Sequence, residues 1–246
     1  MITRPRLAAE ALAAALTCEG AQPFVFPALE IEDLPPTAAL ESALACLRET
    51  SLAIFVSANA VHKGLAAAAR QGPWPAATRV AAVGEATAEA LRDAGFAAVI
   101  SPTERHDSDA LLALAPLQPV AGKNIIVFRG EGGRERLKEA LEARGARVTY
   151  AQCYRRVRPQ SDPAPLLASL RRGSLHAVSA LSGETLENFV AMVGGEGVAL
   201  LRGLALVVPH PAIEAHRGAR HFGRVLVSPH GTPGLIDTLS QLQVTT

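Results

Sequence analysis

Hydroxyl side chains follow apolar segments at places where helices are expected to begin. Ser57 follows the apolar segment 52–56, and Thr87 follows Gly84 after the apolar segment 79–83. A hydroxyl at such a position caps a helix by accepting a hydrogen bond from an unpaired backbone N–H. The same geometry binds a carboxylate, because helix N–H groups and the hydroxyl donate together and a glycine lets the backbone approach. These residues are predicted to start helices, and a carboxylate contact is compatible with that role.

Two arginines follow apolar segments in a similar way. Arg129 and Gly130 open a glycine-rich loop after the apolar segment 124–128, and Arg4 follows Ile2 and Thr3. A guanidinium binds a carboxylate through two parallel hydrogen bonds, so this loop suits carboxylates. A surface salt bridge is the alternative for either arginine.

The glycine-rich loop does not match a nucleotide-binding motif. Gly130 and Gly132 fit the first two places of GxGxxG, but the last place is Glu135. The P-loop pattern GxxxxGK[ST] does not occur in the chain. The sequence therefore argues against a dinucleotide and excludes a P-loop.

Composition excludes several classes of protein. The 246 residues carry a formal net charge of +1, with 49% hydrophobic and 4% aromatic residues, and no run of Lys and Arg appears. Nucleic-acid binding is therefore not expected. No apolar segment reaches the roughly 18 residues of a membrane span, and segment 7–18 is interpreted as an amphipathic helix rather than a leader.

Metal-binding and disulfide patterns are missing from the sequence. The three cysteines are widely spaced without CxxC, HExxH does not occur, and His216 and His221 stand five apart, a poor spacing for one metal. We expect reduced thiols, solvent-facing histidines, no metal or other cofactor, and a cytoplasmic location.

Short apolar segments alternate with amphipathic helical patterns along the whole chain. The apolar segments are nearly continuous in Val, Ile, Leu, Ala and Phe, as expected for strands covered by helices on both faces. Such alternation predicts an α/β fold with parallel sheets. The predicted strands are 24–26, 52–56, 79–83, 97–100, 124–128, 147–151, 176–180, 204–208 and 224–227.

The chain repeats itself at an offset of about 125 residues. Residues 2–4 align with 127–129, and segment 83–87 aligns with 208–212. Ser57 aligns with Ser182, so Ser182 and the nearby Thr185 have the same two interpretations as Ser57. A duplicated α/β half predicts two similar lobes with a ligand cleft between them.

Two short, proline-bounded, extended segments occupy corresponding places in the two copies. We interpret residues 28–35 and 148–159 as connectors. One lobe is then residues 36–147. The other is discontinuous and combines residues 1–27 with 160–246.

The chain resembles the uroporphyrinogen-III synthase family nearly from end to end. No single motif carries the resemblance; the order and spacing of several do. The matching segments are Ile2–Pro5, Ile54–Val61, Ala82–Leu91, Arg129–Gly130 followed by Gly133–Glu135 and Leu137, and Val148–Arg155. The resemblance implies two Rossmann/flavodoxin-like lobes, one discontinuous, with a two-stranded connector and an active site in the cleft.

The resemblance also implies which residues serve the reaction. Tyr154 matches a family tyrosine at the cleft wall, and its phenol can give a proton to a departing hydroxyl. Packing over a lobe edge is the alternative role of Tyr154. The implied substrate-binding residues are Arg4, Ser57, Asn59, Gly84, Thr87, Arg129, Gly130, Ser182 and Thr185.

This chain departs from the family pattern in the second copy. Pro209–Ala212 stands where the family often has Gly-x-x-Thr, so the threonine hydroxyl is missing there. The serine motif at 179–185 is also irregular. The contacts implied for Ser182 and Thr185 therefore rest on an irregular motif, unlike those implied for residues 57–87.

The family's reaction closes the linear tetrapyrrole hydroxymethylbilane with inversion of its last pyrrole ring. Loss of hydroxide gives an azafulvene, and attack at a substituted carbon gives a spiro intermediate that rearranges. The resemblance implies no cofactor, a monomer and a handover of substrate from hydroxymethylbilane synthase. A non-catalytic two-lobe ligand-binding protein is the alternative function.

Overall fold

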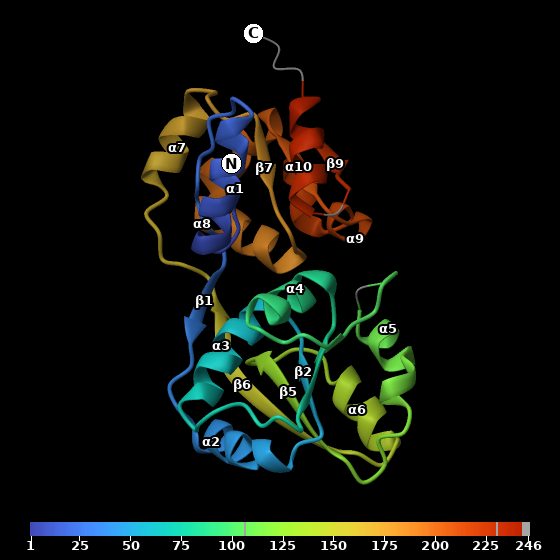
Figure 1. Ribbon diagram of the computed structural model, residues 1–246. Coiled ribbons are helices and arrows are strands. Elements are labelled where there is room, and N and C mark those ends of the chain that lie inside the picture. Colours follow the sequence, from blue (N-terminus) through green and yellow to red (C-terminus); the bar gives the residue numbers. More distant parts are fainter. Residues whose placement is uncertain (106, 230, 243–246) are drawn as a thin grey trace. The chain divides into compact units, whose positions relative to one another are not determined.

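The computed structural model describes residues 1–105, 107–229 and 231–242. Contacts divide the chain into two compact units (Figure 1). The first unit is discontinuous and comprises Met1–Glu30 with Val157–Thr246, and the second comprises Ile31–Arg156. The lobe limits expected from the sequence stay a prediction.

The second unit is built on a six-stranded sheet with the order β1-β6-β5-β2-β3-β4. Strands β2 to β6 pair in parallel, with Leu52 beside both Arg79 and Ile125. The strands are β1 (Glu30–Asp33), β2 (Leu52–Phe55), β3 (Arg79–Ala82), β4 (Val99–Ile100), β5 (Asn124–Gly130) and β6 (Arg147–Val157). The helices are α2 (Ala38–Ala45), α3 (Ala58–Ala69), α4 (Glu85–Asp93), α5 (Ser108–Ala113) and α6 (Arg136–Ala143), with 3-10 turns η1 (Cys46–Glu49) and η2 (Ala115–Leu117).

Alternate residues of these strands enter two separate cores, because successive side chains of a strand point to opposite faces. Ala53 and Phe55 join a core with α2, α3 and α4. Leu52 and Ile54 join a second core with α5 and α6. The sheet therefore lies between two helical layers, which explains why every residue of β2 is buried.

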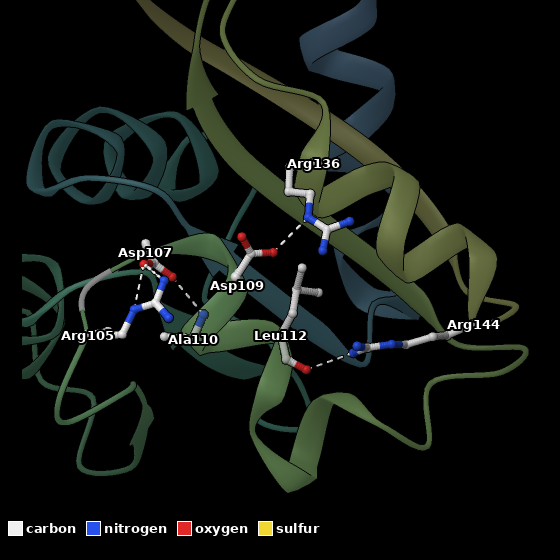
Figure 2. A network of polar contacts seen from close by, with 7 residues as sticks. All are labelled: Arg105, Asp107, Asp109, Ala110, Leu112, Arg136 and Arg144. Atoms are coloured by element: carbon white, nitrogen blue, oxygen red, sulfur yellow. Dashed lines mark hydrogen bonds and ion pairs between the residues drawn. The ribbon is translucent and has the colours of Figure 1, made fainter. Parts of the chain in front are cut away.

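Polar contacts hold α5 beside α6 on the second face (Figure 2). Asp107 caps α5 by accepting from the N–H of Ala110 at 2.8 Å. Arg136, the first residue of α6, binds Asp109 at 2.7 Å. Arg144 donates to the carbonyl of Leu112 at 2.9 Å at the other end. These contacts fix the helix that follows the loop after β5.

The first unit has a smaller sheet with the order β7-β8-β9, all parallel. Ile2 extends this sheet through single parallel bridges to Ser179 and to Val25. The strands are β7 (Ala177–Ser179), β8 (Ala205–Val208) and β9 (Arg224–Val227). The helices are α1 (Arg6–Cys18), α7 (Ala164–Arg171), α8 (Gly183–Leu200), α9 (Pro211–Glu214) and α10 (Gly231–Ser240), with 3-10 turns η3 (Leu201–Gly203) and η4 (Arg217–His221).

Helices cover both faces of this sheet as well. Val178 and Leu206 pack with α7 and α8, where Phe189 is fully buried. Ala177 and Ala205 face α1 and α10 on the other side. The first unit is therefore also a three-layer α/β structure.

The two sheets follow one spatial order at the offset of the repeat. In the second unit, the neighbouring strands β6-β5-β2-β3-β4 have the order 2-1-3-4-5 when β5 is counted as the first strand and β6 as the second. In the first unit, residues near Ile2 and Val25 followed by β7, β8 and β9 give the same order. This is the doubly wound arrangement of flavodoxin-like proteins. The predicted α/β class with parallel sheets is confirmed.

Several strand predictions were wrong in extent. The predicted strand 24–26 is a single bridge at Val25, and the predicted strand 97–100 shortens to Val99–Ile100. The predicted strand 147–151 continues to Val157, because its pairing with β5 reaches Tyr154. Much of the segment interpreted as the second connector is therefore a sheet strand.

Candidate functional site

The carboxyl ends of β5 and β2 form the point where the strand order of the second unit reverses. Ligands of doubly wound sheets bind outside the strand ends at such a point. β5 ends at Gly130, and β2 is followed by Ser57 at the start of α3. These two predicted residues of the second unit therefore lie at the edge where such folds bind ligands.

Ser57 caps α3 and also contacts Tyr154. Its Oγ accepts a hydrogen bond from the N–H of Ala60 at 3.1 Å, as predicted for a cap. The same oxygen lies 3.0 Å from the phenolic oxygen of Tyr154, and either hydroxyl can donate. The structure thus joins a predicted binding residue to the predicted catalytic residue.

A β-bulge directs Tyr154 toward Ser57. Arg129 pairs with Gln152, but the next residue, Gly130, pairs with Tyr154, so Cys153 is the extra residue. Because of this shift, Cys153 and Tyr154 enter the same core although they are neighbours in a strand. Bulges of this kind occur beside active sites, where they re-aim a side chain.

Gly130 makes room for the Tyr154 ring. A Cβ at Gly130 would lie 2.7 Å from ring atom Cε2 of Tyr154, closer than real Cβ atoms come to a neighbour. The carbonyl of Tyr154 also accepts from the N–H of Glu131 at 2.7 Å. The tyrosine is 3% exposed, so the strand and the loop after β5 hold it in place.

Burial makes Cys153 an unreactive neighbour. It raises the pKa of the Cys153 thiol to about 12, so the thiolate, the nucleophilic form, is scarce near neutral pH. The thiol group lies 3.5 Å from the carbonyl oxygen of Arg129. We assign it a packing role.

The start of α4 supplies the other predicted contacts of this unit. Gly84 is the cap residue in extended conformation, and its carbonyl accepts from the N–H of Thr87 at 3.1 Å. Thr87 is 5% exposed, so its side chain packs against the protein more than it faces solvent. Asn59 is half-buried in the first turn of α3, next to the cap. These residues lie at helix starts, as predicted.

Arg129 is engaged by the protein itself. Its Nη1 lies 3.1 Å from Oε1 of Glu135, and its Nη2 donates to the carbonyl of Gly132. The guanidinium carbon lies 4.3 Å from the ring centroid of Tyr150, and Arg129 is 5% exposed. The structure therefore places Arg129 in a salt bridge, the alternative weighed for it, where it fixes the loop after β5.

Arg4 differs from its repeat counterpart. Its Nε is buried and has no hydrogen-bond partner among residues 1–105, 107–229 and 231–242. Burial lowers the pKa of the Arg4 guanidinium. A buried donor without a partner is costly, and a carboxylate would satisfy it. Of the two predicted arginines, Arg4 is the one with an unsatisfied buried donor in the described part of the chain.

Ser182 and Thr185 form the corresponding helix start of the first unit. Ser182 Oγ accepts from the N–H of Thr185 at 3.1 Å and lies 2.9 Å from its hydroxyl. Thr185 is 4% exposed. The two hydroxyls bond to each other, so Ser182 is a cap as predicted.

Two histidines make contacts at helix starts, and the sequence did not predict these contacts. The His216 ring packs on Gly183, where a Cβ would lie 2.9 Å from Cδ2. Its Nδ1 accepts from the N–H of Gly218 at 3.2 Å, so the half-buried His216 is not the solvent-facing residue expected. His210 caps α9 by accepting from Ala212, in the segment that lacks the family threonine. No pattern in the sequence identified either contact.

Within the described chain, no helix is long and apolar enough to span a bilayer. The same residues contain no group of three His, Cys, Asp or Glu side chains arranged to hold a metal ion.

The fold and these strand-end residues define a class: a duplicated, doubly wound α/β protein whose helix starts are suited to anionic ligands. The particular family follows from comparison with known proteins. A family model described as "Uroporphyrinogen-III synthase HemD" matches residues 10–236. The chain belongs to the uroporphyrinogen-III synthase family, as the resemblance predicted.

Individual relatives agree with this assignment. The chain is 37% identical over 188 residues to uroporphyrinogen-III synthase of Salmonella typhimurium, covering 76% of each chain. It is 32% identical over 194 residues to the Escherichia coli enzyme, covering 78% of this chain and 79% of the relative.

Solved structures match the fold. A mutant uroporphyrinogen III synthase of Thermus thermophilus gives a TM-score of 0.61 at 22% identity, covering 98% of this chain and 97% of that one. The Helicobacter pylori protein gives 0.57 at 13% identity, covering 87% and 91%.

Proposed function

We propose that this chain is a uroporphyrinogen-III synthase, a cyclising lyase that converts hydroxymethylbilane into uroporphyrinogen III. Family membership supports the reaction class. The structural observation that carries the proposal is the hydrogen bond between Ser57 and Tyr154 at the strand-order reversal of the second unit. The alternative is a non-catalytic ligand-binding protein, in which Tyr154 would serve only packing.

Tyr154 supplies the proton for the first step. The hydroxyl of the substrate's hydroxymethyl group leaves as water when it receives a proton, and the phenol is the donor. The Ser57 hydroxyl lies 3.0 Å from the phenolic oxygen, and Gly130 leaves room for the ring. Water leaves, and the products of this step are the azafulvene in its cationic form and the phenolate of Tyr154. The cation is electrophilic enough to need no enzyme nucleophile, and the phenolate regains its proton from the substrate when the macrocycle closes.

Helix starts bind the substrate carboxylates. The substrate carries an acetate and a propionate on each pyrrole, yet the chain has a net charge of only +1. The N-termini of α3, α4 and α8 offer N–H groups and partial positive charge, worth about 0.3–1 kcal/mol for each carboxylate. Arg4 adds a full charge, and its Nε has no hydrogen-bond partner among the residues that the structure describes. We assign Asn59, Thr87, Ser182 and Thr185 to the same binding role.

The rest of the catalysis is conformational. Free in water, the linear chain closes without inversion, so the enzyme must direct attack to the substituted carbon of the last ring. Holding the two reacting ends in one geometry and shielding the cation from water supply that control. The spiro intermediate then fragments and recloses, and the macrocycle forms with overall loss of one water.

We further propose a monomer that works in the cytoplasm without a cofactor and receives its substrate from hydroxymethylbilane synthase. Cys18, Cys46 and Cys153 are free thiols, the usual state in a reducing compartment. The reaction steps use only a proton donor and anion contacts, for which the chain has its own side chains.

The test is conversion of hydroxymethylbilane by the purified chain. The macrocycle is oxidised and the uroporphyrin isomers are separated. Isomer III in excess over a protein-free control supports the proposal. Isomer I alone, at the rate of the control, supports the ligand-binding alternative if the chain still binds the tetrapyrrole.

A further inference from the structure

A cavity of about 340 Å³ lies at the amino-terminal ends of β2, β3 and β5. It is at the opposite edge of the sheet from Ser57, Gly84 and Gly130, which follow the carboxyl ends of the strands. The reaction proposed above does not use this edge. Its polar lining includes Arg48, Arg79, Lys123, Glu49 and Ser51.

The charge of this cavity is unbalanced. Three cations and one carboxylate line it, which gives a formal charge of +2. Among the residues the structure describes, Arg48, Arg79 and Lys123 have no carboxylate within ion-pair distance. Other arginines of this unit do: Arg92 pairs with Glu85 at 2.7 Å, and Arg136 pairs with Asp109 at 2.7 Å. The cations around the cavity thus lack the carboxylate partners that Arg92 and Arg136 have.

The backbone that carries these cations is well fixed. The N–H of Arg79 donates to Ser51 at 3.2 Å, and the N–H of Ser51 donates to Asn124 at 2.9 Å. The buried Thr78 hydroxyl donates to Thr50 at 2.9 Å and is also bonded to Leu47, which precedes Arg48. The three charged residues therefore project from a preformed edge, which lowers the cost of binding a ligand.

We propose that this cavity binds a small multivalent anion, such as inorganic phosphate or a short tricarboxylate. Its volume is at the small end of ligand pockets, so it suits such an anion and is too small for a linear tetrapyrrole. A guanidinium pair and an ammonium group provide charge-assisted hydrogen bonds to phosphate or carboxylate oxygens. The lysine is half-buried, which reduces solvent screening of its charge.

The competing explanation is structural. Turn η1 ends at Glu49, and the carbonyl ends of helices attract cations. If Arg48, Arg79 and Lys123 only balance such carbonyls, their removal lowers stability in the absence of any anion. In that case, removing these cations does not change the extra stability that an added anion gives.

The experiment measures thermal unfolding and calorimetric binding with sodium phosphate and, separately, sodium citrate, each against sodium chloride at equal ionic strength. At least one of the two multivalent anions should stabilise the wild-type chain more than chloride does. Arg79→Gln and Lys123→Gln should each weaken the affinity by at least about fivefold, because a charged contact is lost. Glu49→Gln should tighten it, because it removes a like charge from the cavity.

Arg224→Gln is the matched control. Arg224 is exposed and is the first residue of β9, as Arg79 is the first residue of β3. It should leave the affinity unchanged. The proposal is overturned if neither anion stabilises the chain beyond chloride, or if Arg79→Gln and Lys123→Gln keep the wild-type affinity. An unchanged affinity in Glu49→Gln would mean that the anion binds outside this cavity, and it would also overturn the proposal.

Discussion

Gly130→Ala should disturb the site through a single methyl group. The φ angle of Gly130 is not positive, so alanine is allowed by the backbone and the effect is steric. The new Cβ would lie 2.7 Å from Cε2 and 2.9 Å from Cζ of Tyr154, whereas ordinary contact begins at 3.4 Å. The ring must therefore move by about 0.7 Å, the difference between 2.7 and 3.4 Å, or the strand must shift.

This displacement acts on both stability and turnover. The Ser57–Tyr154 pair lies at 3.0 Å, and a ring shift of that size takes the two oxygens out of good hydrogen-bond geometry. Overpacking a dense core costs about 1–3 kcal/mol of unfolding free energy. We expect turnover to fall at least about tenfold, or about 1.4 kcal/mol of barrier, because the proton donor is displaced.

Urea unfolding followed by circular dichroism gives the stability, and uroporphyrin isomer analysis gives the turnover. Gly203→Ala is the control, because its Cβ would meet no atom within 4 Å and its φ is not positive. The control should change the unfolding free energy by less than about 0.5 kcal/mol. Wild-type stability and wild-type formation of isomer III in Gly130→Ala would refute the packing of Tyr154 on Gly130.

The remaining predictions concern the two arginines and the connectors. Arg129→Met should lower the unfolding free energy by about 1–2 kcal/mol in urea, because it removes charged contacts to Glu135 and Gly132. Arg4→Gln should leave the unfolding free energy unchanged or higher and raise the KM, because the Arg4 Nε has no partner among the described residues and its charge serves the ligand. If Arg4→Gln lost as much stability as Arg129→Met, the assignment of Arg129 to protein contacts and of Arg4 to a ligand would be contradicted. Limited proteolysis should cut first near Pro35 and Pro159 and later near the buried Val120. Mass spectrometry of the early fragments identifies the first cuts, and a first cut near Val120 would contradict the expectation.

Local patterns were enough to predict the helix starts and the central strands. Ser57 and Ser182 cap helices because each follows a short buried strand, and that order is visible in the sequence. β2 and β8 are buried on both faces, and their continuous apolar composition indicates this directly. The segment 24–26 has the same composition but forms only a bridge at Val25, because pairing depends on neighbours that composition does not reveal.

Contacts that depend on irregular backbone could not be predicted. The bulge opposite Arg129 turns Tyr154 toward Ser57, a residue 97 positions away in the chain. Arg129 bonds within its own loop because Gly132 and Gly133 take φ angles of 71° and 101°. A glycine in the sequence permits such a turn without specifying it. The repeat suggested equal roles for Arg4 and Arg129, and the loop geometry separates them.

The central claim is that Tyr154, held by Ser57, drives ring closure with inversion. Its most direct test is the isomer ratio formed from hydroxymethylbilane by the wild-type chain and by Tyr154→Phe at equal concentration. The wild type should form mainly isomer III. The folded variant should form isomer III at a rate at least about tenfold lower, with isomer I rising as spontaneous closure competes. Equal rates of isomer III from both proteins would contradict the role of Tyr154, and isomer I alone from the wild type would contradict the function.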